Sequence, residues 1–157
     1  MTDNNKLIIG LIGEIAAGKT TITKYLEKKH DVVSFRFSDM LSDMLDRIHV
    51  EKKRENLQSL SIFLREAYGE DFMSKVIALD VAKTDNPIIV VEGIRRPTDI
   101  IYLKKYPEFH LWAIDTEAQT RFERLTSRNE KPDDQKKTWE KFQKESTNES
   151  EAQITTV

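Results

Sequence analysis

The segment GEIAAGKT at residues 13–20 constrains the fold of this 157-residue chain more than any other part of its sequence. It fits the pattern GxxxxGK(S/T), which joins a buried strand to the first turn of a helix. An apolar run at residues 7–12 precedes it and is rich enough in β-branched residues to be a strand buried on both faces. After it, Ile22, Tyr25 and Leu26 recur at helical spacing. Both structural conditions of the pattern are therefore met.

This loop has the chemistry of a site for a nucleoside triphosphate. Its glycines let successive backbone N–H groups converge on phosphate oxygens, and the helix that starts near Gly18 adds the positive end of its dipole. We expect Lys19 to reach the β and γ phosphates and the Thr20 hydroxyl to bind Mg²⁺. Because a carboxylate repels polyphosphate, we expect Glu14 to point away. The predicted nucleotide-binding residues of the loop are Gly13, Ala16, Ala17, Gly18, Lys19, Thr20 and Thr21.

Strands and helices are expected to alternate along the rest of the chain. Further strands are predicted at residues 32–37, 87–91 and 110–114. Helices are predicted at 19–29, 39–48, 71–83 and 117–128, with a longer one over 57–64 that ends near Gly69 and a short one after Pro97. This alternation predicts an α/β, three-layer P-loop NTPase fold with a central parallel sheet flanked by helices. Such sheets bind their ligands at the carboxyl ends of the strands.

Composition limits the classes of partner. The 25 basic and 27 acidic residues leave a net charge of −2, which argues against a protein that binds a nucleic acid polymer. No apolar stretch approaches the roughly 18 residues of a membrane helix, so we expect no membrane association. The chain has no cysteine, and its three histidines lack metal-ligand spacing. One domain, without a signal peptide and in the cytoplasm, is the expected organisation.

A second cluster of charged residues follows the strand predicted at 87–91. Glu92 ends that strand, and Arg95 and Arg96 come shortly after it. An acid at this edge of the sheet can position Mg²⁺ as a Walker B residue does, and arginine forks bind phosphate bidentately. The alternative is an ordinary ion pair between Glu92 and a neighbouring arginine. Beside a P-loop, the metal and substrate roles are favoured.

Past residue 128 the chain becomes strongly charged, with Trp139 and Phe142 as its apolar anchors. This composition predicts a mobile helical lid, with Trp139 packing the lid onto the body or stacking on a base. The last dozen residues are polar and expected to be poorly ordered.

Four segments together resemble the P-loop nucleotide kinases, and in particular little-characterised predicted kinases related to adenylate kinase and dephospho-CoA kinase. These segments are GLIGEIAAGKTT, SFRFSDML, IIVVEGIRRP and TRFERLTSR. The resemblance covers nearly the whole chain, and its P-loop is the most specific part. It implies one kinase-like domain over residues 1–157, with an acceptor-binding helical region at about 39–84, a lid at about 128–145 and a polar tail at 146–157.

The resemblance also implies roles for individual residues. It assigns Asp39 to the edge of the acceptor site, although Asp39 or Ser38 is alternatively the N-cap of the following helix. The implied catalytic residues are Lys19, Asp39, Arg95 and Arg128, and Arg124 joins the nucleotide-binding set on the adenine side. The implied acceptor-binding residues are Asp39, Arg65, Glu92, Arg95 and Arg96, and the implied metal ligands are Thr20 and Glu92.

The chain departs from this family at several positions. Adenylate kinases have an arginine where this chain has Ser42, which argues against a standard AMP site. Lys131 stands at a lid position that is often arginine in the relatives, and Lys144 and Glu145 stand where they have an Arg-Asp pair. Lysine keeps the charge but loses the planar fork. The relatives also continue through another strand and helix, so we expect either a sheet without one edge strand or a shortened chain.

The function that these features predict is transfer of the γ-phosphoryl group of ATP, with Mg²⁺, to a nucleotide-like small molecule. A nucleoside monophosphate is the first candidate acceptor, and the protein is expected to be a monomer or homodimer. Phosphorylation of a hydroxyl, as on dephospho-CoA, and a regulatory nucleotide-binding ATPase module are the alternatives. GTP stays open as a donor, although no NKxD segment for guanine selectivity is present.

Overall fold

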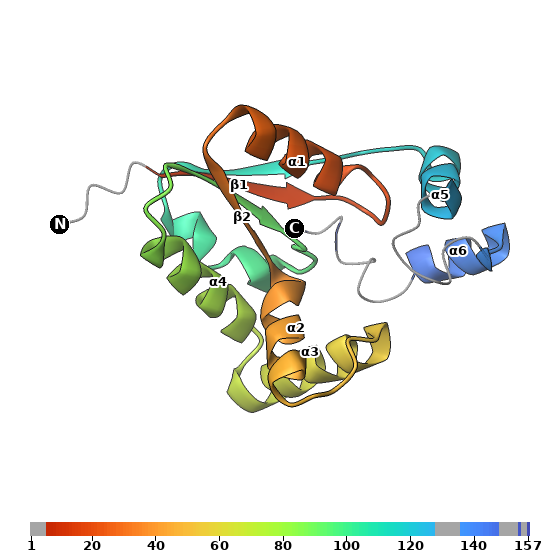
Figure 1. Cartoon of the computed structure of the whole chain (residues 1–157), viewed down its shortest axis with the longest axis horizontal. Helices are drawn as coiled ribbons and strands as arrows, with labels where there is room; N and C mark the ends of the chain where they lie inside the picture. The colour runs from red at the N-terminus through yellow and green to blue at the C-terminus, as the bar shows by residue number, and fades with distance from the viewer. Residues whose placement is uncertain (1–5, 128–135, 148–153, 155–156) are drawn as a thin grey trace.

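The computed structural model describes residues 6–127 and 136–147, together with Ile154 and Val157. Its centre is a parallel sheet with the strand order β2-β3-β1-β4. The strands are β1 (Leu7–Ile12), β2 (Val32–Arg36), β3 (Ile88–Glu92) and β4 (Phe109–Ala113). The helices are α1 (Lys19–Lys29), α2 (Phe37–Arg47), α3 (Arg54–Tyr68), α4 (Phe72–Lys83), α5 (Ala118–Ser127) and α6 (Trp139–Ser146), with 3₁₀ turns η1 (Pro97–Ile100) and η2 (Leu103–Lys105). The predicted α/β fold is confirmed (Figure 1).

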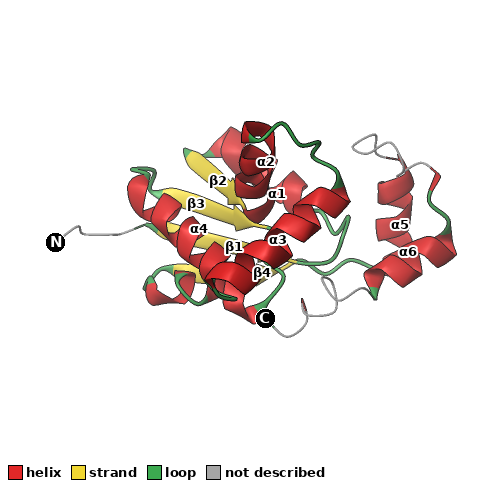
Figure 2. Ribbon diagram, turned by 90° about the horizontal axis from the view of Figure 1, so that it is seen from below, coloured by secondary structure: helices red, strands yellow, loops and turns green. Residues whose placement is uncertain are grey.

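Alternate residues of the central strands supply two separate apolar layers. Ile9 and Leu11 of β1 pack with Val90 of β3 on one face, where side chains of α1 contact them. On the other face Ile8 and Ile89 join a larger core to which α2, α3, α4 and both 3₁₀ turns contribute. Burial on both faces explains why these strands are continuous apolar runs. The helices therefore enclose the sheet from both sides (Figure 2).

The passage from β2 into α2 differs from the prediction. We expected the strand to continue through Phe37, and Ser38 or Asp39 to cap a helix that starts later. Instead Arg36 is the N-cap, in an extended conformation, and α2 begins at Phe37 without a side-chain cap. Phe37 is buried in the core, so its apolar character serves the first turn of the helix. The N-cap role considered for Asp39 is therefore wrong.

The helix α6 lies beside α5, beyond the carboxyl ends of the strands (Figures 1 and 2). Phe122 of α5 lies 5.3 Å from Trp139 and 5.5 Å from Phe142, between ring centroids. Trp139 thus packs α6 against α5, which is one of the two roles predicted for this residue. Residues 128–135 of the predicted lid, which include Arg128 and Lys131, lie outside the described part of the chain.

The expectation of a poorly ordered polar tail mostly concerns residues outside the described part of the chain. Its exception is Ile154, which is buried in the larger core with Val157 against it. Hydropathy averaged over a polar segment does not reveal a single buried anchor of this kind. Among the described residues, no helix is long and apolar enough to cross a membrane.

A buried ion pair joins α3 to the segment after β3. Arg65 and Asp99 have side-chain exposures of 6% and 2%, and Arg65 Nη2 lies 2.7 Å from Asp99 Oδ1. The other oxygen of Asp99 accepts hydrogen bonds from the backbone N–H groups of Arg95 and Arg96, at 2.9 and 3.0 Å. Asp99 therefore fixes the path of the chain where it leaves the sheet.

Substitution of Asp99 by Asn should lower the free energy of unfolding by about 3–5 kcal/mol, because Arg65 then becomes a buried charge without its partner. Urea unfolding measures this change. The matched control is Asp46→Asn, which removes an exposed ion pair with Lys52 and should cost at most about 1 kcal/mol. Equal effects of the two substitutions would contradict the structural role of Asp99.

Candidate nucleotide and acceptor site

The loop between β1 and α1 has the curled backbone that phosphate binding requires. Gly18 is the N-cap of α1 with φ of 110°, a left-handed conformation that glycine adopts without strain. A Cβ on Gly13 would lie 2.5 Å from the carbonyl oxygen of Ile114, so this position also requires glycine. Glycine is thus required at each of these two positions for a different reason: backbone conformation at Gly18 and close contact at Gly13.

Lys19 lies over the inside of this loop. Its Nζ donates hydrogen bonds to the carbonyl oxygens of Gly13, at 2.5 Å, and Glu14, at 2.8 Å. The ammonium group is therefore held at the mouth of the loop, where the phosphates of a bound nucleotide would lie. Thr21, the last predicted residue of the set, is exposed on α1.

The ends of β1 and β3 bring Thr20 and Glu92 together. Thr20 Oγ1 donates to Glu92 Oε2 over 3.4 Å, and Arg36 Nη2 donates to the same oxygen over 2.9 Å. Arg36 is directly opposite Glu92 in the β2–β3 register. Sequence reasoning missed Arg36, because only the pairing of β2 with β3 reveals this contact.

Thr20 and Glu92 fit the ligand preference of Mg²⁺. Glu92 is buried, and its second oxygen, Oε1, has no hydrogen-bond partner among the residues that the structure describes. A hydroxyl and a carboxylate are hard oxygen donors, and protein-bound Mg²⁺ keeps several waters, so it requires few protein ligands. Within the described part of the chain there is no group of three or more His, Cys, Asp or Glu side chains suited to a metal. These two residues are therefore the candidate metal ligands.

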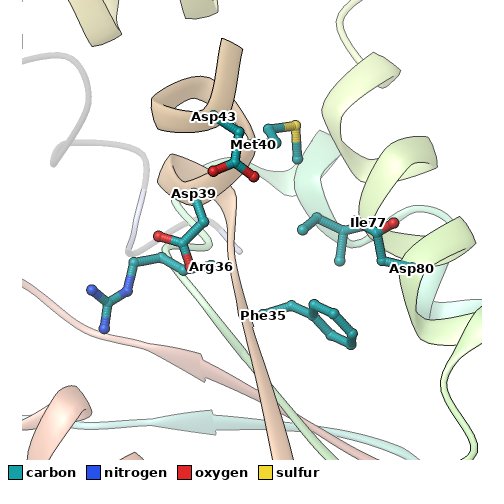
Figure 3. Close-up of a pocket in the computed structure, with 7 residues that line it drawn as sticks. All are labelled: Phe35, Arg36, Asp39, Met40, Asp43, Ile77 and Asp80. Carbon is teal, nitrogen blue, oxygen red and sulfur yellow. The ribbon is translucent and has the colours of Figure 1, made fainter. Parts of the chain in front are cut away.

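Asp39 lies in a cavity of about 200 Å³ between β2, α2 and α4. Figure 3 shows Asp39 and Asp43 from neighbouring turns of α2 at this cavity. Partial burial of its carboxyl group raises the pKa of Asp39, Arg36 opposes the increase, and the charges of Asp43 and Glu92 add to it. The cavity is lined by Phe35, Arg36, Asp39, Met40, Asp43, Ile77 and Asp80.

A second cavity, of about 230 Å³, brings Arg65 and Arg96 together. Glu70 lies between them, with its Oε2 3.2 Å from Arg96 Nη1 and 4.0 Å from Arg65 Nη1. Glu70 is 60% exposed, whereas the Arg96 side chain is 25% exposed. Two of the predicted acceptor-binding arginines therefore share one cavity, and the third, Arg95, is exposed.

Two arginines of α5 contact the P-loop. Arg124 Nη1 donates to the carbonyl oxygen of Ala17 over 3.2 Å, which places this predicted residue at the loop. Arg121 was not predicted, although it is buried and lies 2.9 Å from Glu14. The only signal for it in the sequence is the acid within the phosphate-binding loop, which favours a cationic partner without indicating which residue supplies it.

The chain is similar to known proteins over most of its length. A family model described as AAA domain matches residues 9–155. A UPF0200 protein of Methanococcus maripaludis is 31% identical over 128 residues, which are 80% of this chain and 69% of the relative. The UPF0200 protein of Methanocaldococcus jannaschii is 30% identical over 138 residues, or 87% and 68% of the two chains.

Solved structures extend the likeness to the fold. The structure of TT1252 from Thermus thermophilus has a TM-score of 0.60 at 13% identity and covers 94% of this chain and 83% of its own. Shikimate kinase from Bacteroides thetaiotaomicron has a TM-score of 0.57 at 18% identity, and the match covers 95% of this chain and 82% of the shikimate kinase. The chain therefore shares its fold with these two proteins. With a family match from residue 9 to residue 155, the chain belongs to the AAA-domain family, and its relatives place it among the UPF0200 proteins.

Proposed function

We propose that the protein transfers the γ-phosphoryl group of ATP to a nucleotide-like small-molecule acceptor, with a nucleoside monophosphate as the first candidate. The observation that carries this proposal is the convergence of Lys19, Thr20 and Glu92 at the carboxyl ends of β1 and β3. Phosphoryl transfer depends on positioning and on neutralising the charge spread over the phosphates, and these are the groups required for both.

The P-loop and α5 would hold the donor. Backbone N–H groups of the loop and the Lys19 ammonium would bind the β and γ phosphates, and Arg124 lies at the same loop. Mg²⁺, held by Thr20 and Glu92, would supply further neutralisation of phosphate charge. Arg36 keeps the Glu92 carboxylate in place from the side of β2. Arg128 is also proposed to act from the lid, and this proposal rests only on the resemblance to the nucleotide kinases.

The second cavity supports an anionic acceptor. The Glu70 carboxylate lies against Arg96 and near Arg65, where it provides the negative charge that an acceptor phosphate would provide. Because Glu70 is exposed and its ion pairs are weak, a phosphate can displace it at little cost. Arg65 is already bound to Asp99, so Arg96 would make the main contact with the acceptor.

A hydroxyl acceptor is the second candidate, and the environment of Asp39 favours it. A raised pKa makes this carboxylate a better proton acceptor than an ordinary aspartate. As the acceptor oxygen bonds to the γ-phosphorus and ADP leaves, Asp39 would take the hydroxyl proton. A monophosphate acceptor is already an anion and requires no such base.

Turnover that depends on an acceptor tests the proposal directly. ADP formation should rise strongly when single nucleoside monophosphates or dephospho-CoA are added to the protein with ATP and Mg²⁺. Lys19→Met should lower this rate by about 10²–10³-fold, the loss typical when one preorganised cationic or hydrogen-bonding donor is removed from a reaction site. Slow hydrolysis that no acceptor stimulates would reject the kinase function in favour of a regulatory ATPase.

Substitutions at the second cavity should change the KM for the acceptor in opposite directions. Arg96→Met removes a cation and should raise KM about tenfold for a phosphate-bearing acceptor, a difference of 1.4 kcal/mol. Glu70→Gln removes the competing carboxylate and should lower KM, with the ATP affinity unchanged in both variants. Steady-state kinetics at saturating ATP give these values. A KM that neither substitution alters would place the acceptor elsewhere.

Asp39→Asn separates the two candidate acceptors. For a hydroxyl acceptor, kcat should fall about 10²-fold or more, since a general base contributes about 10²–10⁴-fold. In the wild type, kcat should decline as the pH falls through the pKa of Asp39, which is above that of an ordinary aspartate, and this decline should be absent in the variant. For a monophosphate acceptor, Asp39→Asn should lower kcat only slightly and should leave the dependence of kcat on low pH unchanged.

A further inference from the structure

We propose that Arg121 is a positioning residue of the nucleotide site, which holds the Glu14 carboxylate away from the phosphates and braces the P-loop. This inference rests on the proposed nucleotide site. Nothing in the P-loop pattern, which leaves the position of Glu14 unspecified, requires an acid there or an arginine more than a hundred residues later.

Each nitrogen of the Arg121 guanidinium group has a partner in the loop or its surroundings. Its Nη2 lies 2.9 Å from Glu14 Oε2, and its Nη1 donates to the carbonyl oxygen of Ile15 over 3.4 Å. Its Nε donates to the carbonyl oxygen of Thr116 over 3.0 Å. The planar fork thus contacts two consecutive P-loop residues and the chain that leads into α5. Lysine, with a single ammonium, cannot make these contacts together.

Glu14 is the reason that such a contact is needed. Lys19 Nζ bonds to the backbone oxygen of Glu14, so this residue is part of the loop that would surround the phosphates. A free carboxylate at this place would repel a polyphosphate, and the repulsion would be strong because the surroundings are partly buried. The side chain of Glu14 is 37% exposed, whereas that of Arg121 is 5% exposed. Arg121 therefore neutralises the acid from the protein side and leaves the phosphate side open.

Arg121 also connects the P-loop to α6. Its guanidinium carbon lies 5.3 Å from the ring centroid of Phe142, which is buried between α5 and α6. On the same helix, Glu145 binds Lys137 at 2.6 Å and lies 3.7 Å from Arg54 of α3. The packing of α6 thus helps to bury the arginine side of the ion pair. The brace depends on this helix as well as on Glu14.

Calorimetric binding of ATP, ADP and AMP to four proteins tests the inference. These are the wild type, Arg121→Met, Glu14→Gln and the double variant. Arg121→Met keeps an apolar side chain against Phe142 but frees the Glu14 charge, so it should weaken ATP binding at least about tenfold, ADP binding less and AMP binding least. The double variant should recover to within about threefold of the wild type, because the repelling charge is gone. Arg47→Met, on an exposed residue of α2, is the matched control for the loss of one arginine and should bind as the wild type.

The outcomes are distinct. A double variant as weak as Arg121→Met would mean that the arginine acts by packing alone, and equal losses for the three nucleotides would mean the same. Wild-type affinity in Arg121→Met would overturn the inference and leave the proposed function intact, whereas a wild type that binds no ATP would overturn both. If thermal unfolding shows that Arg121→Met does not fold, Glu14→Gln carries the test. It should bind ATP at least as tightly as the wild type, and weaker binding would contradict a repulsive Glu14.

Discussion

The parallel pairing of β1 with β3 is the constraint on which the candidate site depends. Gly10 of β1 is opposite Val91 of β3, so the P-loop and Glu92 leave the sheet at the same edge. A shift of this register by one residue would turn every side chain to the opposite face. The apolar layers that fill both faces of these strands prevent such a shift, and they thereby hold Thr20 within reach of Glu92. Core packing thus determines the geometry of the proposed chemistry.

Local patterns were sufficient to predict the fold and the strand, loop and helix that form the P-loop segment. These patterns are continuous apolar runs, helical spacing and two glycines in the turn, and each depends only on neighbouring residues. The strand β1, the P-loop and α1 therefore lie where they were predicted. Arg36 and Arg121 could not be found in this way. Each contacts an acid that is distant in the sequence, and the sequence does not state which arginine of several faces that acid. The prediction of where α2 begins was wrong for a related reason. The position of its N-cap follows from the pairing of β2 with β3, which no local signal contains.

Three arginine–carboxylate pairs hold the edge of the sheet where the ligands would bind. Arg36 binds Glu92, Arg65 binds Asp99 and Arg121 binds Glu14, and each pair includes at least one buried side chain. Buried ion pairs are weak contributors to net stability, but they specify geometry because a displaced partner leaves a costly unpaired charge. A site made of loops has little apolar surface with which to fix its shape. Charge pairing supplies the rigidity that apolar packing supplies in the body of the molecule.

The two cavities differ in charge, and this difference constrains how an acceptor can lie. The charged residues that line the first are Arg36, Asp39, Asp43 and Asp80, and those that line the second are Arg65, Glu66, Glu70 and Arg96. An acceptor phosphate in the first cavity would meet three carboxylates against the single guanidinium group of Arg36, and burial already makes Asp39 harder to ionise than usual. In the second it would meet two guanidinium groups, which balance the carboxylates of Glu66 and Glu70, and it can displace the exposed Glu70. A phosphate-bearing acceptor therefore favours the second cavity, and a group that enters the first must be neutral or able to give up a proton. Both candidate acceptors satisfy this rule. The phosphate of a monophosphate acceptor would lie in the second cavity, whereas the hydroxyl of the alternative acceptor would lie beside Asp39 in the first.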